Sequence, residues 1–461
     1  MPLKYLLFSL LFFLTTMLYA QDDTLCQQIA GQSVQWMQKG ESNKLFYYFT
    51  EKVASKLSLE TTKELWPQIV SQYGNFKNID TIIDAYHKPF LLVDCILDFE
   101  NGKLRYRLTF NKENKISGIF FSPYQQQKTS TYEPQNTAFY TEKKFDFVND
   151  RILFPALLCM PKNRPAVAVA ILVHGSGPND MNESIGPNKI FMQLAHQLAK
   201  QGIATLRYQK RTYLIAHQKA TDAYPHDIQH IVVNDALAAI NALAKTPALE
   251  KTPIFIVGHS LGAFLAPLIA SKTNKISGIV LMAANASPLE DVIVDQYNYL
   301  YARNGYTKVE KQEIKKIKRQ AKNVKSLEKD LKKGKEKALP LTSDTSFWLS
   351  LNKYNPIKVA NSLTVPMLII RGSRDYQISE KEFRLWGKGL RKPHRTYDTF
   401  RSNDTLFFKT VLPITFVSYN GLNHLFIKGT AKSYPEEYNH RGNVSAIVVS
   451  DMANWIKSVL K

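Results

Sequence analysis

A serine between two glycines is the first group in this chain that could do covalent chemistry. Ser260 lies in the pentapeptide Gly-His-Ser-Leu-Gly, residues 258–262. One apolar run, 254–257, precedes it, and another of helical length, 263–270, follows it. A strand, a sharp turn and a helix in this order lift a serine hydroxyl clear of a sheet, as a nucleophile requires. The alternative is a glycine-rich helix start capped by Ser260, but the two apolar runs favour the nucleophile.

A serine that attacks a carbonyl also needs N–H donors for the oxyanion that forms. The N–H of Leu261, at the start of the expected helix, is one candidate. The second donor of such a site comes from the loop after an earlier strand. Here the apolar run 167–173 ends in His174 and a Gly-Ser-Gly sequence. We predict that the N–H of Ser176 is this donor, with that of Gly177 beside it. His174 is predicted to order the loop.

The nucleophile must be activated by a histidine that a carboxylate orients. In the chain order Ser, acid, His, the acid and the base follow strands downstream of the nucleophile. Asp375 follows the apolar run 367–370, and His424 follows the run 413–419. We predict that His424 takes the proton of Ser260 and that Asp375 fixes the tautomer of His424. The alternatives are less well placed: Asp291 and Asp295 for the acid, and His394 and His440 for the base.

The elements that must position these residues alternate between strands and helices. Apolar strand-like runs such as 203–208 and 278–282 are separated by helical runs such as 190–199 and 228–244. Strands that are apolar throughout are buried on both faces of a parallel sheet. The repeated strand–helix units predict a doubly wound, mostly parallel sheet within residues 138–461. The Gly-x-Ser-x-Gly turn at residues 258–262 resembles that of α/β-hydrolases, which implies the α/β-hydrolase fold for this domain.

The alternation stops between residues 287 and 356. Thirteen basic and five acidic side chains lie between 308 and 337. An insertion here lies above the carboxyl ends of the strands, so we predict a helical cap over the site. Its aromatic residues are candidates to line an acyl pocket: Tyr297, Tyr301, Phe347 and Trp348. The lysines are expected to form a solvated face; the alternative is a surface that attracts anionic esters or an anionic envelope.

A small α+β domain is predicted over residues 21–124, and the polar stretch 125–137 is its linker to the larger domain. Helical spacing gives way to strand-like alternation along it: helices over 25–36 and 65–74, and strands over 89–99, 104–110 and 116–121. Helices followed by an antiparallel meander form such a domain. We recognise no catalytic set within it and expect an accessory role.

The first residues predict an exported protein. Residues 1–4 are basic, 5–19 are almost wholly apolar, and Ala20 precedes a polar stretch. This pattern predicts a cleaved signal peptide over 1–20, with the mature chain starting near Gln21, in the periplasm or outside the cell. The alternative is an uncleaved anchor, but the apolar run is shorter than the ~20 residues that span a bilayer.

The cysteines and the net charge indicate which kinds of ligand and partner the protein is expected to bind. The three cysteines, Cys26, Cys95 and Cys159, match no metal-binding spacing. Cys26 and Cys95 could pair in an oxidising compartment or remain buried thiols. Sixty Lys and Arg against 39 Asp and Glu give a formal net charge of +21, which attracts polyanions. The chain carries no recognisable nucleic-acid-binding motif. We therefore expect no nucleic acid, metal or cofactor.

Several motifs resemble known families. Those of the larger domain are similar to a bacterial carboxylesterase family of the serine-aminopeptidase-like α/β-hydrolases: residues 174–180, 185–189, 206–212, 258–262, 375–377 and 421–426. Those of the smaller domain resemble a domain of unknown function that precedes secreted hydrolases and is thought to have a nuclear-transport-factor-like fold: residues 73–74, 98–102 and 115–123. The resemblance implies hydrolysis of carboxylic esters with short acyl chains, without a cofactor. Gln209 stands where relatives more often have Asp, and we expect it to be structural.

The leading hypothesis is an exported serine carboxylesterase that acts on a small-molecule ester through an acyl-serine intermediate. A second hypothesis keeps the same residues but has them cleave amides or peptides, although no acid that would anchor a free amino group stands out. A third is a non-catalytic, envelope-associated binding protein. The complete set of Ser260, Asp375 and His424 argues against the third.

Overall fold

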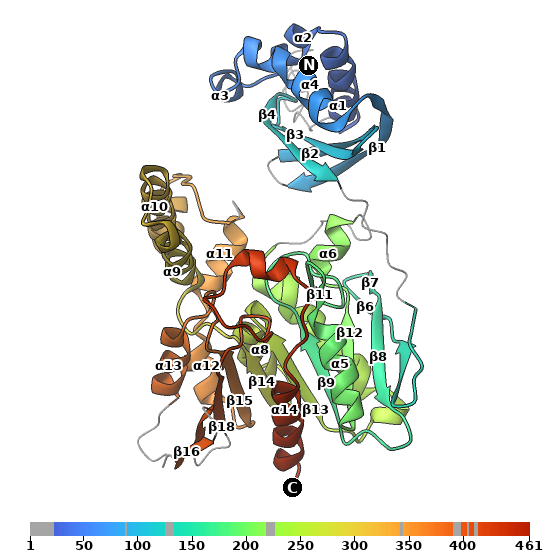
Figure 1. Ribbon diagram of the computed structural model, residues 1–461, viewed down its shortest axis with the longest axis vertical. Helices are drawn as coiled ribbons and strands as arrows, with labels where there is room; N and C mark the ends of the chain where they lie inside the picture. Colours follow the sequence, from blue (N-terminus) through green and yellow to red (C-terminus); the bar gives the residue numbers. More distant parts are fainter. Residues whose placement is uncertain are drawn as a thin grey trace, which may run out of the picture. The chain divides into compact units, whose positions relative to one another are not determined.

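The computed structural model describes residues 23–87, 90–124, 133–217, 226–341, 344–390, 398–402, 405–409 and 414–461. The chain divides into two compact units, Met1–Tyr132 and Glu133–Lys461, which we describe one at a time (Figure 1). The predicted signal peptide, residues 125–132 of the predicted linker and the alternative base His394 lie outside the described residues. Within the described ranges, no helix is both long and apolar enough to cross a bilayer.

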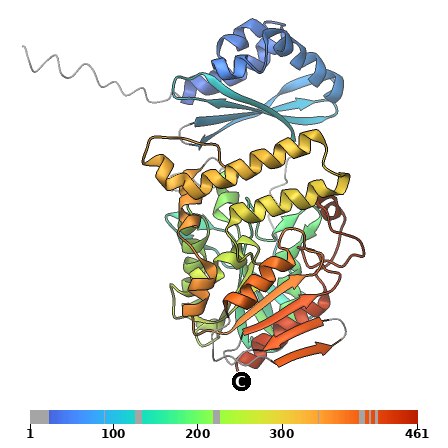
Figure 2. The same ribbon diagram turned by 90° about the vertical axis from the view of Figure 1, so that its left-hand side faces the viewer.

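The N-terminal unit packs helices against one face of a four-stranded antiparallel sheet with the order β1-β2-β3-β4 (Figure 2). Its helices are α1 (Asp23–Gln38), α2 (Ser42–Tyr47), α3 (Glu51–Ala54) and α4 (Leu59–Tyr73), and its strands are β1 (Phe76–His87), β2 (Phe90–Phe99), β3 (Gly102–Phe110) and β4 (Ile116–Tyr124). In β3 every second side chain is buried, as expected of a sheet with one covered face. The predicted α+β class is confirmed.

Strand β1 was missing from the sequence prediction. Its pairing with β2 shifts register between Phe76 and Asn78 and again between Ile79 and Thr81. Each shift moves the following side chains to the opposite face of the sheet. The apolar residues therefore do not alternate regularly along the strand, and the period of two that revealed the other strands is lost.

Cys26 and Cys95 of this unit are buried and form no disulfide within the part of the chain that the structure describes, which is the second of the two expected alternatives. The Sγ atom of Cys26 lies 3.4 Å from the side-chain oxygen of Asn114. Burial raises the pKa of Cys95 to about 12, which keeps this thiol protonated and unreactive.

The C-terminal unit is built on a ten-stranded sheet with the order β16-β17-β18-β15-β14-β13-β9-β12-β8-β5. Neighbours from β12 to β18 run parallel, and the strands at both edges are antiparallel. The strands are β5 (Tyr140–Lys144), β8 (Ala156–Pro161), β9 (Ala168–Val173), β12 (Ile203–Tyr208), β13 (Ile254–His259), β14 (Ile276–Met282), β15 (Met367–Gly372), β16 (Asp398–Ser402), β17 (Thr405–Lys409) and β18 (Ile414–Tyr419). The predicted α/β-hydrolase fold is confirmed, and the β16–β17 hairpin is an addition to it.

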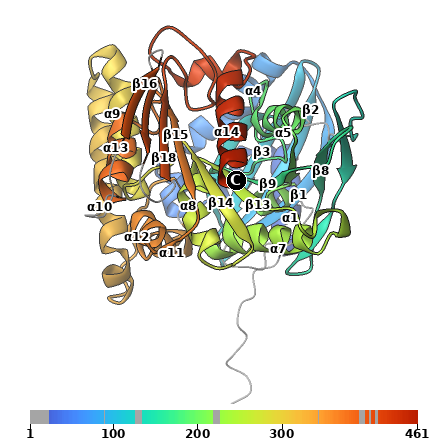
Figure 3. The same ribbon diagram turned by 90° about the horizontal axis from the view of Figure 1, so that it is seen from below.

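Helices cover both faces of this sheet (Figure 3). On one face lie α5 (Ile190–Lys200) and α14 (Ala446–Val459), and on the other lie α7 (Asn234–Ala244), α8 (Leu261–Ala270) and α12 (Pro356–Ser362). In β9 the side chains alternate between the two cores: Val169, Ile171 and Val173 join one, and Ala168, Ala170 and Leu172 join the other. All six are fully buried, which explains why the strand reads as a continuous apolar run.

Short elements complete the unit. They are β6 (Phe147–Asn149), β7 (Ile152–Phe154), β10 (Ser184–Ile185), β11 (Asn188–Lys189), α6 (Arg211–Ala216), η1 (Gln229–Val233), η2 (Pro247–Leu249), α13 (Glu380–Gly389) and η4 (Pro435–Asn439).

The insertion between β14 and β15 is helical. It forms α9 (Leu289–Tyr301), η3 (Ala302–Asn304), α10 (Lys308–Leu331) and α11 (Thr345–Asn352) before α12. Helices α9 and α10 lie side by side (Figure 2). Helix α10 begins at a capping box in which the side chains of Thr307 and Glu310 each bind the other's backbone N–H. Its apolar positions, among them Ile314, Ile317 and Val324, are buried, and its lysines point outward.

Candidate active site

The candidate nucleophile, Ser260, lies in a strained turn between β13 and α8. Its backbone has φ 52° and ψ −116°, a conformation that side chains other than glycine rarely adopt. The N–H of Ser260 donates to the Met282 carbonyl at 2.9 Å, and its own carbonyl accepts the N–H of Phe264 at 2.9 Å. A side chain at Gly262 would collide with the Val173 carbonyl, and one at Gly258 would collide with Gly262. The sequence Gly-x-Ser-x-Gly is therefore a packing requirement of this turn.

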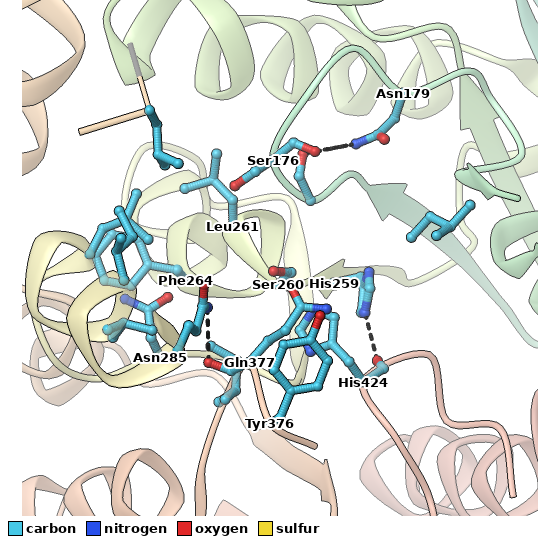
Figure 4. Close-up of a pocket in the computed structure, with 18 of the residues that line it drawn as sticks. Ser176, Asn179, His259, Ser260, Leu261, Phe264, Asn285, Tyr376, Gln377 and His424 are labelled. Atoms are coloured by element: carbon cyan, nitrogen blue, oxygen red, sulfur yellow. Dashed lines mark hydrogen bonds between the residues drawn. The ribbon is translucent and has the colours of Figure 1, made fainter. Parts of the chain in front are cut away.

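The candidate acid and base meet above the carboxyl ends of β15 and β18. The Nδ1 atom of His424 lies 2.8 Å from Oδ2 of Asp375, and both residues are buried. Because a carboxylate can only accept, Nδ1 carries the proton and Nε2 is left to accept one. The other carboxylate oxygen accepts the N–H groups of Gln377 and Ile378 at 2.8 and 2.9 Å. His424 and Ser260 line the same cavity (Figure 4).

The loop that carries His424 is held in place by the side chain of the preceding residue, Asn423. The side-chain oxygen of Asn423 accepts the N–H groups of Leu425 and Ile427 at 3.0 and 3.1 Å. The Asn423 amide group donates to Glu437, which also pairs with Arg374 at 2.7 Å. Sequence reasoning did not find Asn423, although it directly precedes the predicted base.

Side chains hold the carbonyl groups of the candidate oxyanion loop, residues 174–180. The ammonium group of Lys210 donates to the carbonyls of Gly175 and Gly177 at 2.6 and 2.9 Å. The amide of Asn179 donates to the carbonyl of Gly175 at 3.0 Å and to that of Ser176 at 3.0 Å, and Figure 4 shows the second of these bonds. In a planar trans peptide the following N–H points the opposite way from the carbonyl. The N–H of Ser176 therefore points away from Lys210 and Asn179, and the N–H of Gly177 points away from Asn179.

The predicted oxyanion donors are placed differently from one another. Ser176 and Leu261 line the cavity, whereas Gly177 is absent from the described lining. The loop follows β9 and the nucleophile follows β13, two neighbouring strands between which the chain reverses its order across the sheet. Ligands of such sheets bind in the crevice at that reversal.

Lys210, which sequence reasoning missed, follows β12. Burial lowers the pKa of its ammonium group to about 8.

Two other residues of the sequence analysis have structural roles. The Nε2 atom of His174 lies 3.1 Å from the Asp180 carbonyl, so this histidine orders the loop. The side-chain oxygen of Gln209 accepts the N–H of Met181 at 3.0 Å.

The alternative acids lie on the insertion, where Asp291 pairs with Lys325 at 2.6 Å and Asp295 pairs with Lys381 at 2.8 Å. Neither these acids nor His440 belongs to the described cavity lining.

We expect His174 to make the free energy of unfolding depend on pH. Burial lowers its pKa from 6.5 to about 4, so the folded protein keeps His174 neutral where the unfolded chain takes up a proton. Stability should therefore fall as the pH drops from about 6.5 toward 4, by as much as about 3 kcal/mol from this group. Urea unfolding of the wild type and of His174→Gln over this range measures the effect as the difference between the two. An equal slope in both proteins would contradict it.

The cavity has a volume of about 400 Å³ and a largely apolar wall. The apolar side chains include Leu261 and Phe264 of α8 and three of α9: Leu289, Val292 and Ile293. Glu183 is the one carboxylate among the described lining residues, and no lysine or arginine is among them. Within the described ranges, no cluster of three His, Cys, Asp or Glu side chains could hold a metal ion.

The prediction that four aromatic residues of the insertion line the cavity is wrong. Trp348 is fully buried in the core and Phe347 packs against that core. Tyr297 and Tyr301 contact each other, with ring centroids 5.7 Å apart. The stripe of α9 that faces the cavity is aliphatic and ends in one amide: Leu289, Val292, Ile293 and Gln296. The helical period decides which residues of α9 face the cavity, and Tyr297 and Tyr301 lie outside that stripe.

Comparisons with known proteins match both units. The family described as "Serine aminopeptidase, S33" matches residues 165–402, and a family of unknown function, DUF3887, matches residues 30–119. Esterase EstD of Thermotoga maritima is 31% identical over 412 residues, which are 88% of this chain and 89% of EstD. Solved structures are more distant. Est1E from Butyrivibrio proteoclasticus is 14% identical, with a TM-score of 0.41, over 69% of this chain and 98% of its own. The Pyrococcus furiosus esterase Pf2001 is 15% identical, with a TM-score of 0.41, over 69% and 91%.

Proposed function

We propose, from the premise that this chain belongs to the serine aminopeptidase S33 family of α/β-hydrolases, that it cleaves carboxylic esters through an acyl-serine intermediate. The chain is a carboxylic ester hydrolase. One observation carries the mechanism. The Asp375–His424 pair lies at the cavity that holds Ser260 in its strained turn.

The reaction has two halves in this proposal. Ser260 Oγ attacks the ester carbonyl while His424 Nε2 takes its proton, and the N–H groups of Ser176 and Leu261 stabilise the oxyanion. The bond to the alcohol oxygen then breaks, and His424 gives the proton to the leaving alcohol. Water then attacks the acyl carbon while His424 Nε2 takes a proton from it, the bond between that carbon and Ser260 Oγ breaks, and His424 returns the proton to Oγ as the carboxylic acid leaves. Asp375 holds the tautomer of His424 and stabilises the imidazolium.

Release of p-nitrophenol from acetyl, butyryl and octanoyl esters tests the proposal, with labelling of Ser260 by a fluorophosphonate probe as a second measure. Turnover together with labelling supports it. A folded wild type that neither turns over these esters nor reacts with the probe would favour the binding-protein hypothesis. A wild type that is labelled but does not cleave esters would direct attention to amides.

We expect a preference for short acyl chains. The cavity of about 400 Å³ is near the lower end of the range for small-molecule sites, so a long acyl chain would have to extend beyond it. The value of kcat/KM for the butyryl ester should exceed that for the octanoyl ester by about tenfold, as steric exclusion of several methylenes permits. Equal values, measured below the micelle concentration of each ester, would contradict this expectation.

Cleavage of peptides by the same residues has less support. An aminopeptidase needs a free carboxylate in its site for the substrate's α-ammonium group. Glu183, the carboxylate among the described lining residues, already accepts the N–H of Gly175 at 2.6 Å and faces His259. Amino-acid p-nitroanilides should therefore be poor substrates compared with p-nitrophenyl esters.

We also propose that the protein is exported. The support is the sequence pattern of residues 1–20, a basic start, an apolar run and a small residue before Gln21. Mass spectrometry of the protein from its native host tests the proposal. A mature chain that starts near Gln21 is the expected result, and an intact Met1 would contradict it.

A contact of the insertion with anionic lipid is a further part of the proposal. Helix α10 buries its apolar stripe and exposes lysines, including Lys311, Lys315, Lys318 and Lys322. Each basic side chain near an anionic surface contributes about 1 kcal/mol of attraction. Cosedimentation with phosphatidylglycerol vesicles, but not with phosphatidylcholine vesicles, is expected. Replacing these four lysines with glutamate should abolish it; vesicle binding that survives the exchange would refute the contact.

A further inference from the structure

We propose that Glu183 is a positioning residue that locks three loops of the site together: the oxyanion loop, the nucleophile turn (residues 258–262) and the histidine loop (residues 420–427). The inference rests on the ester hydrolysis proposed above, because it concerns the geometry that this reaction needs. Glu183 itself follows the oxyanion loop in the chain and lies between β9 and β10.

The contacts of Glu183 form a continuous path across the site. One carboxylate oxygen accepts the N–H of Gly175 in the oxyanion loop at 2.6 Å. The other lies 3.1 Å from Nδ1 of His259, at an angle outside hydrogen-bond geometry. The Nε2 atom of His259 lies 3.0 Å from the backbone oxygen of His424 (Figure 4). Since a carbonyl oxygen can only accept, this nitrogen carries a proton and donates it.

Because Glu183 and His259 are buried, the loss of either one would be costly for the other. Glu183 and His259 are each only 1% exposed. A carboxylate out of water is costly unless partners satisfy it, and removing one partner of such a pair leaves an uncompensated charge. Both oxygens of Glu183 face groups on catalytic loops. The carboxylate therefore constrains those loops rather than remote parts of the fold.

The backbone of Glu183 is strained, because it has a conformation that residues other than glycine rarely adopt. Its φ is 47°, in the left-handed region. The turn is held by Asp180, whose carbonyl accepts the N–H of Glu183 at 2.9 Å and whose carboxylate accepts those of Asn182 and Ser184. Strain of this kind gathers at functional sites, where the surrounding structure enforces it.

The charge of Glu183 determines the state of His259. Burial alone would lower the pKa of His259, but the Glu183 carboxylate and the His424 carbonyl outweigh burial and raise it. Other charged or titratable groups nearby are Asp375, His174 and Lys210. A protonated His259 attracts the carboxylate on one side and donates to the carbonyl on the other. The backbone of His424 is fixed in this way while Asp375 fixes its ring.

This arrangement predicts a loss of kcat rather than of substrate affinity. Without the carboxylate, the His424 backbone and the Gly175 N–H each lose a constraint, and both belong to groups that act on the transition state. We expect kcat of Glu183→Ala to fall about 100-fold, with KM changed less than threefold. Losses of this size follow when a residue that orients a catalytic group, without itself touching the substrate, is removed. Glu183→Gln keeps an acceptor for Gly175 but not the charge, and a fall of about tenfold is expected.

A matched control distinguishes positioning from stability. Glu142 is a similarly buried carboxylate on β5, paired with His196 and Arg207 at 2.7 Å. Glu142→Ala should lower the unfolding temperature and leave kcat of the folded protein unchanged. If Glu183→Ala does not yield folded protein, Glu183→Gln decides alone. A folded Glu183 variant whose kcat stays within twofold of wild type overturns the inference, while the wild-type turnover still supports the esterase.

A double-mutant cycle tests the route through His259. If Glu183 acts through His259, then Glu183→Ala should cost much less in a His259→Ala background than in the wild type, about fivefold instead of 100-fold. Fully multiplicative losses would show that the two residues act independently and would overturn the path proposed here. Fluorophosphonate labelling of Ser260 gives the same comparison without ester turnover, so a failed substrate choice is not mistaken for a failed inference.

Discussion

Ser260→Ala should abolish ester hydrolysis, with kcat reduced by about 10⁴-fold or more. The hydroxyl is the group that forms the acyl intermediate, and no other hydroxyl in the described lining shares its place beside His424 on the strained turn. The fluorophosphonate probe should fail to label the variant. Initial rates with the butyryl ester, at enzyme concentrations high enough to detect the residual rate, measure the loss.

The fold of this variant should survive. Alanine retains the Cβ atom and the backbone bonds to Met282 and Phe264, so circular dichroism and the unfolding temperature should stay close to wild type. Ser271→Ala, at the far end of α8, is the matched control and should keep full activity. A Ser260→Ala protein that retains more than a few per cent of the rate, free of wild-type contamination, would show that another group is the nucleophile.

Asp375→Asn should lower kcat by about 10⁴-fold through the tautomer of His424. One oxygen of Asp375 accepts the N–H groups of Gln377 and Ile378, so the oxygen of the new amide will take that place. Its NH₂ group then faces Nδ1 of His424 and must donate to it. The proton of the imidazole moves to Nε2, which can no longer accept the proton of Ser260.

This outcome differs from simple loss of a buried group. Asp375→Asn should bind substrate with little change in KM and should fold, because the backbone contacts of the side chain are kept. Asp295→Asn is the control, since this alternative acid pairs with the half-exposed Lys381 on the surface and should not affect the rate. If the Asp295 variant were the inactive one, the assignment of the acid would be wrong.

The sequence alone allowed us to predict which residues would meet at one edge of the sheet, because their positions follow from the order of strands along the chain. Ser260, Asp375 and His424 each follow a strand that reads as an apolar run, and parallel strands bring their carboxyl ends to one edge. This is why residues more than a hundred positions apart could be assigned to one site. The sheet itself was predictable for the same reason, because strands buried on both faces have no polar positions.

Other features depended on contacts that no local pattern encodes. Glu183 and Lys210 act on loops that precede them by 8 and 35 residues, through bonds that exist only in the folded chain. The neighbouring residues gave no signal, because Glu183 and Lys210 each lie in a stretch of polar and charged residues, 179–184 and 207–212. The face of α9 that lines the cavity was also missed, since helix rotation is set by packing against the sheet.

The insertion begins and ends on adjacent strands, since β14 and β15 pair directly along Ile279–Met282 and Met367–Ile370. The sheet would close without the intervening segment. None of Ser260, Asp375 and His424 comes from it, yet α9 supplies four lining residues of the cavity. The three residues proposed for the chemistry and the four lining residues of α9 thus lie on separate stretches of the chain. An insertion exchanged between related enzymes would therefore change one wall of the cavity and leave Ser260, Asp375 and His424 in place.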